Sequence, residues 1–198
     1  MKEVMEIDVI PKKPVLSKVE GRKRYTYEDY AKLPEGAPYQ LIGAHLIKLP
    51  APVPYHQEVS KKIGYLLYEH VELKQKLGEI YSAPIDVYFE EEETYQPDIV
   101  FISKERIWII KEDKIEGAPD LVIEILSPST AYYDLVHKKE IYARHGVKEY
   151  WIVDPMEKKI DIYENRGGEF IFFKKAGKSE RINSIIIDGF EVEIDTIF

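Results

Sequence analysis

Residues 119–130 read PDLVIEILSPST, and the fold of the chain can be inferred outward from this short stretch. Its centre is apolar enough to form a buried strand over about 119–126, yet it contains the acid Glu124. A buried carboxylate costs several kcal/mol unless another group compensates its charge. The stretch therefore predicts a core strand and a compensating partner for Glu124 from elsewhere in the chain.

The two faces of this strand have different characters. Strand side chains alternate, so Leu121, Ile123 and Ile125 share one face, which we expect to pack under a helix. Asp120 and Glu124 share the other face, about 13 Å apart at the rise of a strand, too far to share a metal ion. We expect Asp120 to mark the entry of the strand and Glu124 to find its partner on another segment.

Helical patterns lie on both sides of this strand in the sequence. Apolar residues at spacings of three and four predict an amphipathic helix over about 56–77. A second helix is expected over about 130–145, because Gly146 is typical of a helix end. The strand-like KEYWIVD follows, and strand, helix and strand in succession predict a crossover between parallel strands.

Antiparallel pairs are expected around this unit. The runs 83–89 and 96–102 read as two strands of a hairpin, joined by a solvated loop with the acidic run Glu90 to Glu93. YQLIGAHLIKL predicts a hairpin or a pair of short strands, and TYEDYAKLPEG predicts a short helix that Thr26 caps. KIDIYEN and EFIFFKK predict a hairpin around RGG, and SIIIDGFEVEI reads as a last strand. The fold class is therefore α/β, a mixed sheet flanked by helices with an antiparallel extension at the C-terminal end.

Composition narrows the class of protein. The 198 residues are 44% hydrophobic and 32% charged, with no cysteine and a net charge of −8. These values are typical of a soluble globular protein, and the lack of cysteine excludes disulfides and thiolate zinc sites. The sequence has neither a run of ~18 apolar residues nor a secretory h-region, so we expect a cytoplasmic protein without membrane contact. Residues 1–24 read as an arm and residues 25–198 as one domain.

The arm is locally basic in a chain whose overall charge disfavours non-specific binding of nucleic acid. It is therefore a weak candidate for a nucleic-acid contact. Its candidate residues are Lys12, Lys13, Arg22, Lys23 and Arg24.

Asp98 is the best candidate partner for Glu124. In QPDIVFI it stands after a proline, where a strand begins. If the two strands are neighbours at ~4.8 Å, both carboxylates can point at one spot and hold Mg²⁺ or Mn²⁺. Such an ion would polarise a phosphoryl oxygen and lower the pKa of an attacking water.

Lys138 is the candidate cation for the negative charge that develops in such a reaction. It lies four residues after Asp134 and four before Tyr142, so the three share one helix face. Lys139 lies about 100° round the helix and is expected to point elsewhere. The alternative for Lys138 is a solvated helix surface.

These segments together resemble a known nuclease family. APIDVYF, QPDIVFI, PDLVIEILSPST and YARHGVKEYWIVDP, in this order, are similar to the Uma-two family of restriction endonucleases within the PD-(D/E)XK nuclease superfamily. The resemblance covers about residues 25–198. It implies a restriction-endonuclease-like mixed sheet flanked by helices, a divalent metal site and cleavage of DNA phosphodiester bonds. It implies Asp98 and Glu124 as metal ligands, and Lys138 as the catalytic lysine because Leu126 stands where the superfamily motif has lysine.

Three accessory candidates follow from the same resemblance. Gln40 stands where relatives commonly carry an acid, and an amide can hydrogen-bond a metal-bound water without supplying charge. His56 either acts on the substrate or stabilises the start of the long helix. Asp86 either supports the metal ligands or caps a surface segment.

The leading hypothesis is a Mg²⁺-dependent endodeoxyribonuclease with DNA as its partner, and many nucleases of this superfamily act as homodimers. The alternative is a catalytically silent member that binds nucleic acid or protein. Gln40 and the acidic balance favour the silent member, whereas the joint presence of Asp98, Glu124 and Lys138 favours the enzyme. A metal-assisted hydrolase of a small substrate ranks last, because no pattern predicts a dedicated pocket.

Overall fold

Glu124 lies in strand β8 (Leu121–Ile125), an inner strand of a six-stranded sheet in the computed structural model, which describes residues 23–198. The strand order is β11-β10-β9-β8-β6-β3. Strand β8 pairs in parallel with β9 and antiparallel with β6, so the sheet is mixed, as predicted. The other strands are β3 (Gly78–Ser82), β6 (Ile99–Ser103), β9 (Glu149–Asp154), β10 (Lys159–Arg166) and β11 (Glu169–Ala176).

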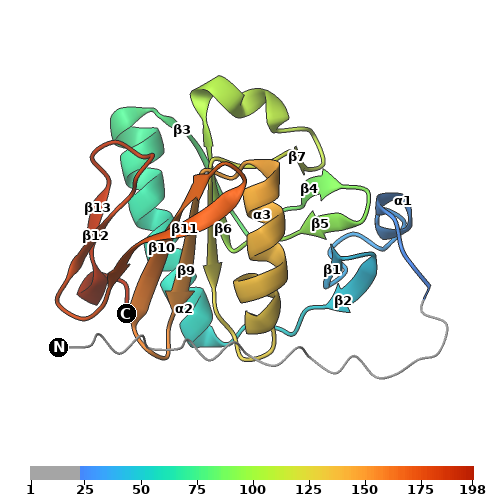
Figure 1. The fold of residues 1–198 in the computed structure, drawn as a ribbon, viewed down its shortest axis with the longest axis horizontal. Coiled ribbons are helices and arrows are strands. Elements are labelled where there is room, and N and C mark those ends of the chain that lie inside the picture. The colour runs from blue at the N-terminus through green and yellow to red at the C-terminus, as the bar shows by residue number, and fades with distance from the viewer. Residues whose placement is uncertain (1–22) are drawn as a thin grey trace.

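Helices cover both faces of this sheet (Figure 1). Helix α2 (Pro54–Tyr68) continues into the wider turns of η1 (Glu69–Gln75), close to the predicted helix. On the other face, η3 (Tyr133–Lys138) continues into α3 (Lys139–His145), which ends at Gly146 as predicted. Gly146 has a φ of 92°, a left-handed conformation that glycine adopts at little cost.

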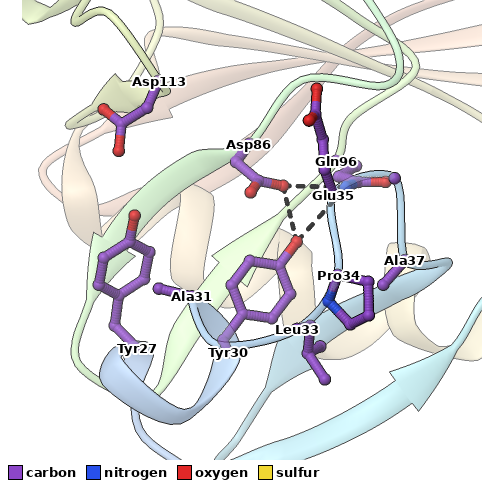
Figure 2. A pocket seen from close by; sticks show the side chains of 11 residues that line it. Tyr27, Tyr30, Ala31, Leu33, Pro34, Glu35, Ala37, Asp86, Gln96 and Asp113 are labelled. Atoms are coloured by element: carbon purple, nitrogen blue, oxygen red, sulfur yellow. Dashed lines mark hydrogen bonds between the residues drawn. The ribbon is translucent and has the colours of Figure 1, made fainter.

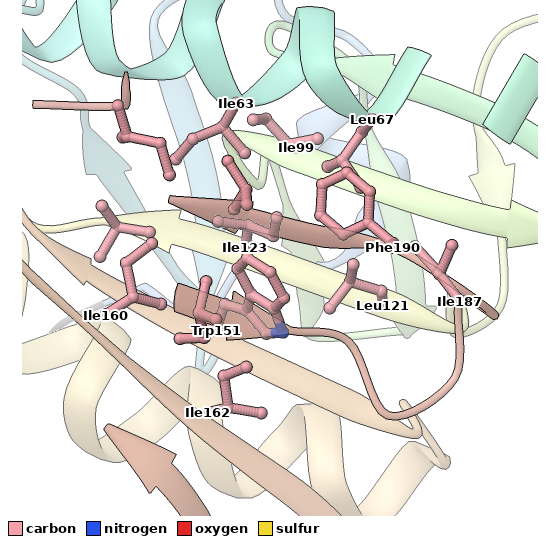
Figure 3. Packing of buried hydrophobic residues seen from close by; sticks show 14 of the residues in the cluster. Ile63, Leu67, Ile99, Leu121, Ile123, Trp151, Ile160, Ile162, Ile187 and Phe190 are labelled. Carbon is pink, nitrogen blue, oxygen red and sulfur yellow. The ribbon is translucent and has the colours of Figure 1, made fainter. Parts of the chain in front are cut away.

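The apolar face of β8 packs under α2, as predicted. Figure 3 shows Ile63 and Leu67 of α2 above Leu121 and Ile123, with Trp151 of β9 beside them. These side chains are buried, and each large buried side chain contributes about 1.5–3 kcal/mol through the hydrophobic effect. Because this face of β8 packs on α2, the opposite face, which carries Glu124, is turned toward α3.

A smaller five-stranded sheet lies beside this core, with the order β2-β1-β5-β4-β7. The predicted hairpin at 39–48 and the short helix are present, and the helix starts with a capping box at Thr26. The chain also forms the 3₁₀ helices η2 and η4. The bounds are α1 (Tyr27–Tyr30), β1 (Tyr39–Ile42), β2 (His45–Lys48), β4 (Val87–Glu90), β5 (Glu93–Tyr95), η2 (Lys104–Ile109), β7 (Ile115–Glu116) and η4 (Ile194–Thr196).

The predicted hairpin between 83–89 and 96–102 is wrong. Strand β4 pairs with β5, and the chain then leaves the smaller sheet to enter the larger one as β6. Pro97 stands at the crossing, where its missing N–H and fixed φ suit a break between two strands. The acidic run is also more than a solvated loop, because Glu93 is buried within β5.

The C-terminal segment confirms one prediction and corrects another. Strands β10 and β11 form the predicted antiparallel hairpin. The predicted last strand over 184–194 is wrong for most of its length, because strand geometry covers only β13 (Glu191–Glu193), which pairs with β12 (Arg181–Asn183). Glu149 accepts hydrogen bonds from the backbone N–H groups of Ile185 and Ile186, which draws this segment away from a ladder.

Lys12, Lys13 and Arg22 of the expected arm lie outside the described residues. Across residues 23–198, no helix has the length and apolar character needed to cross a bilayer.

The close approach of β3 and β6 gives a test of the fold. A Cβ added at Gly78 would lie 2.0 Å from the backbone oxygen of Ile102, which cannot retreat without disturbing the sheet. We expect Gly78→Ala to lower the free energy of unfolding in urea by about 2–3 kcal/mol. The control Gly64→Ala lies in α2, where its Cβ would be 3.4 Å from the Ser82 hydroxyl, and should leave stability unchanged or raise it by up to about 1 kcal/mol. Equal stability of the two variants would contradict the packing of β3 on β6.

Candidate active site

Glu124 is buried on the face of β8 that α3 covers, with 3% of its surface exposed. Two donors reach its Oε1: the Lys138 Nζ at 3.0 Å and the Tyr142 hydroxyl at 2.6 Å. These two residues are four apart on one continuous helical segment, so they project from the same face. The helix thus supplies the partners that a carboxyl group buried in a strand requires.

Lys138 is held between two acids. Its Nζ lies 2.8 Å from Oδ1 of Asp134 and 3.0 Å from Oε1 of Glu124, and the whole side chain is buried. Burial disfavours the charged ammonium, but the two carboxylates outweigh this and raise the pKa of Lys138. Lys139 points elsewhere, as the helical spacing predicts, and its ammonium lies over the ring of Tyr163. Lys138 is therefore a buried cation, and the alternative of a solvated helix surface is wrong.

Asp98 stands directly before β6, next to β8. The register pairs Ile99 with Ile123, which brings Asp98 to the level of Glu124 on the neighbouring strand. Its Oδ2 accepts a hydrogen bond from the backbone N–H of Ile125 at 2.8 Å. Asp98 and Glu124 therefore lie side by side on neighbouring strands, as predicted. The hydrogen bond to Ile125 holds the Asp98 carboxylate next to Glu124.

His56 joins this group from the start of α2. Its Nε2 lies 3.0 Å from the carbonyl oxygen of Ile125 and 3.5 Å from Oδ2 of Asp98. Because a carbonyl can only accept, Nε2 carries the proton in this arrangement. The hydrogen bond to Asp98 raises the pKa of His56, although burial opposes it. His56 thus ties the helix start to both strands, and its buried Nδ1 has no hydrogen-bond partner among residues 23–198.

With every carboxyl group ionised, the cluster carries an excess of negative charge. Asp98, Glu124 and Asp134 then bring three negative charges and Lys138 brings one positive charge, which leaves −2 with His56 neutral. Burial raises the pKa of Glu124 to about 8; the Lys138 ammonium opposes this rise, and the Asp134 and Asp98 carboxylates add to it. A divalent cation would compensate such an excess, and the available ligands are hard oxygen atoms.

Asp98 and Glu124 are the pair that could hold such an ion. Both described donors to Glu124 reach Oε1, so neither occupies Oε2. In the described part of the chain, no group of three or more His, Cys, Asp or Glu side chains has the arrangement of a metal cluster. An ion here would accordingly take two carboxylates and complete its shell with water or backbone carbonyl oxygen, as Mg²⁺ commonly does.

Asp120, at the other end of β8, has a separate structural role. It accepts a hydrogen bond from the Ser103 N–H at 2.8 Å and forms ion pairs with Arg106 and Lys148. This agrees with its expected role at the strand entry.

Asp86 lies in a pocket of about 320 Å³ between α1 and the smaller sheet (Figure 2). It accepts hydrogen bonds from the Tyr30 hydroxyl at 2.7 Å and from the Gln96 amide at 2.9 Å. These contacts tie Asp86 to α1 and to Gln96, and among the described residues no hydrogen bond joins Asp86 to Asp98 or Glu124, so they give no support to a role beside the metal ligands.

Gln40 is buried in β1, and its Oε1 has no hydrogen-bond partner among the described residues. Within residues 23–198, no hydrogen bond joins Gln40 to Asp98 or Glu124. The structure therefore does not link Gln40 directly to the two carboxylates.

Two basic residues expected to contact nucleic acid are paired with acids. Lys23 lies 3.5 Å from Asp29, and the guanidinium of Arg24 donates two hydrogen bonds to Glu92. Their role at a nucleic-acid surface stays a prediction.

Sequence reasoning missed a second network, centred on Glu93. The Gly43 N–H and the His137 Nε2 both lie 2.9 Å from Glu93 carboxylate oxygens, and the Tyr95 hydroxyl also donates to it. This network ties the β1–β2 turn to the residue before Lys138. Burial opposes ionisation, but the bonds from His137, Tyr95 and Gly43 outweigh it and lower the pKa of Glu93. A buried acid within an acidic run gives no local signal of these distant partners.

Comparisons with known proteins agree with this architecture. A family whose model is described as "Uma2: Putative restriction endonuclease" matches residues 27–192. A solved structure, described as a "putative nuclease belonging to DUF820 from Anabaena variabilis ATCC 29413", is similar with a TM-score of 0.73 and 22% sequence identity. The similarity covers 87% of this chain and 97% of that one and concerns the fold. No curated protein matches the chain.

The lowered pKa of Glu93 predicts a stability that depends on pH. A carboxylate with a depressed pKa stabilises the fold above its unfolded-state pKa and loses that contribution as pH falls through the folded-state pKa. We expect Glu93→Gln to lower the free energy of unfolding by about 1–3 kcal/mol at pH 7, with the deficit vanishing in acid as the wild-type side chain protonates. Urea titrations across this range measure it. Glu91→Gln, at an exposed position, should change stability by less than about 0.5 kcal/mol, and a deficit of Glu93→Gln that persists in acid would contradict the assignment.

Proposed function

The chain belongs to the Uma2 family, and on that basis we propose that it is a metal-dependent endonuclease that hydrolyses DNA phosphodiester bonds. One observation supports this most: Asp98, Glu124 and Lys138 come from three different elements and meet at one end of β8. The family match supports the class of reaction, and the geometry supports these residues as its centre.

In this proposal Asp98 and Glu124 hold Mg²⁺ or Mn²⁺. The excess of carboxylates over ammonium groups fits a hard dication, and Mg²⁺ needs few protein ligands because it keeps several waters. When bound, such an ion polarises a phosphoryl oxygen and lowers the pKa of water.

Lys138 supplies positive charge beside the phosphate. Its ammonium has three N–H donors, and the two carboxylates that flank it account for two of them. We assign the third to a phosphoryl oxygen, where a fixed charge in a dry site stabilises the negative charge of the transition state. The raised pKa of Lys138 keeps this charge in place at neutral pH.

His56 and Tyr142 are positioning residues in this proposal. The Tyr142 hydroxyl donates to Oε1 of Glu124 and so orients the carboxylate. The His56 ring contacts both Asp98 and the Ile125 carbonyl, which fixes the two strands relative to each other at the site. Both residues can hold these groups in place while their rings are shielded from solvent.

Cleavage of DNA tests the proposal. Supercoiled plasmid and single-stranded DNA are incubated with Mg²⁺ or Mn²⁺ and with wild type, Asp98→Asn, Glu124→Gln or Lys138→Met. We expect wild type to cut and each variant to lose at least about 100-fold in rate, the usual effect of removing one transition-state contact. The matched control is Lys139→Met, which removes the adjacent lysine over Tyr163 and should keep most of the activity.

Two results would contradict the proposal. Cutting that survives in both Asp98→Asn and Lys138→Met, with unchanged thermal unfolding, would show that the centre lies elsewhere. A wild-type protein that cuts with neither metal but still binds DNA would favour the silent binding member of the same fold.

A further inference from the structure

Strand β11 forms one edge of the six-stranded sheet and exposes an apolar run. Ile171, Phe172 and Phe173 in its middle are 44%, 53% and 46% exposed. In the described part of the chain no strand pairs with the outer side of β11, so its outward N–H and C=O groups are open. An open edge with large apolar side chains is a template for pairing with another strand.

The exposed run is poorly guarded against such pairing. Charged side chains and bulges usually protect an edge. Here the two lysines of β11 stand at its C-terminal end, and one irregularity at Phe173 lets Phe172 and Lys174 face consecutive residues of β10. The middle of the strand carries no charge.

The distribution of the exposed side chains indicates what would cover them. Ile171 and Phe172 precede the irregularity and therefore point to opposite faces of the sheet, so a partner that docks on one face leaves the other exposed. A further strand at the edge brings side chains to both faces at once and satisfies the open backbone groups. The exposed run therefore fits strand addition better than docking on a flat surface.

We propose that β11 pairs antiparallel with β11 of a second copy of this chain, across a two-fold axis near Phe172. The strand reads EFIFFKKA, which is complementary to itself in this orientation. The exposed Glu169 at its start meets the Lys174–Lys175 pair of the other copy, and the apolar middles meet each other. The two sheets then become one continuous sheet.

The charged groups of β11 are available for this pairing. Within the described residues Lys175 forms a long ion pair, 3.7 Å, with Asp161, and the Lys174 ammonium bonds the Asn183 side chain at 3.0 Å. Both lysines can turn to an exposed carboxylate at small cost because their chains are flexible.

Another exposed apolar pair, Ile107 and Trp108, lies in η2. Because it offers no open strand edge and no self-complementary charge pattern, it serves as the control surface.

Sedimentation equilibrium of the full chain tests the proposal. Wild type should sediment at twice the mass of one chain. Phe172→Lys, Glu169→Lys, and the double variant Lys174→Glu with Lys175→Glu should each raise the dimer dissociation constant by at least about tenfold, because each places like charges opposite each other or a charge at the axis. Trp108→Lys should remain as dimeric as wild type.

An experiment that mixes two variants distinguishes this pairing most sharply from other modes of association. Glu169→Lys and the double glutamate variant each repel themselves but complement each other, so an equimolar mixture should restore dimers. A monomeric wild type, variants that stay dimeric, a mixture that stays monomeric, or loss of the dimer in Trp108→Lys would each overturn the proposal. Circular dichroism confirms that the variants fold, and no readout depends on nuclease activity.

Discussion

A buried ammonium between two carboxylates is the interaction on which the rest of the site depends. Lys138 comes from the helical segment that covers the sheet, and Glu124 comes from an inner strand. Removing one partner of such a pair leaves a buried charge without compensation, at a cost of about 3–5 kcal/mol. The helix is therefore bound to the strand by charge as well as by packing, and its position relative to Glu124 is fixed.

The other site residues follow from the sheet to which this helix is tied. The antiparallel partner β6 delivers Asp98 beside β8, and the packing of α2 on the opposite face brings His56 to the same end. Asp98, Glu124 and His56 thus lie at or next to the ends of rigid elements, and Lys138 lies within a continuous helical segment. The same assembly places the Glu124 and Asp134 carboxylates on one ammonium and brings Asp98 beside Glu124, and this concentration of carboxyl groups gives a physical reason for a divalent ion.

Sequence periodicity predicted which site residues share a face of a strand or of a helix. The alternation of β8 predicted its two faces, and the spacing of 134, 138 and 142 predicted a shared helix face. The strand that follows Asp98 was recognisable, but its partner was not: the sequence predicted a hairpin with 83–89, whereas β6 pairs with β3 and β8. Glu93 read as a surface acid because its partners, Gly43 and His137, are distant in the chain. Such contacts depend on the assembled fold and have no local signature.

Binding of Mn²⁺ in the absence of DNA tests the proposed metal centre most directly. In calorimetric titrations we expect wild type to bind the ion, and Asp98→Asn and Glu124→Gln to bind it at least about tenfold more weakly. Asp120→Asn is the matched control, because Asp120 is a buried acid of the same strand region held by Ser103, Arg106 and Lys148. Binding in Asp98→Asn as tight as in wild type, or no binding by wild type, would contradict a metal centre at Asp98 and Glu124.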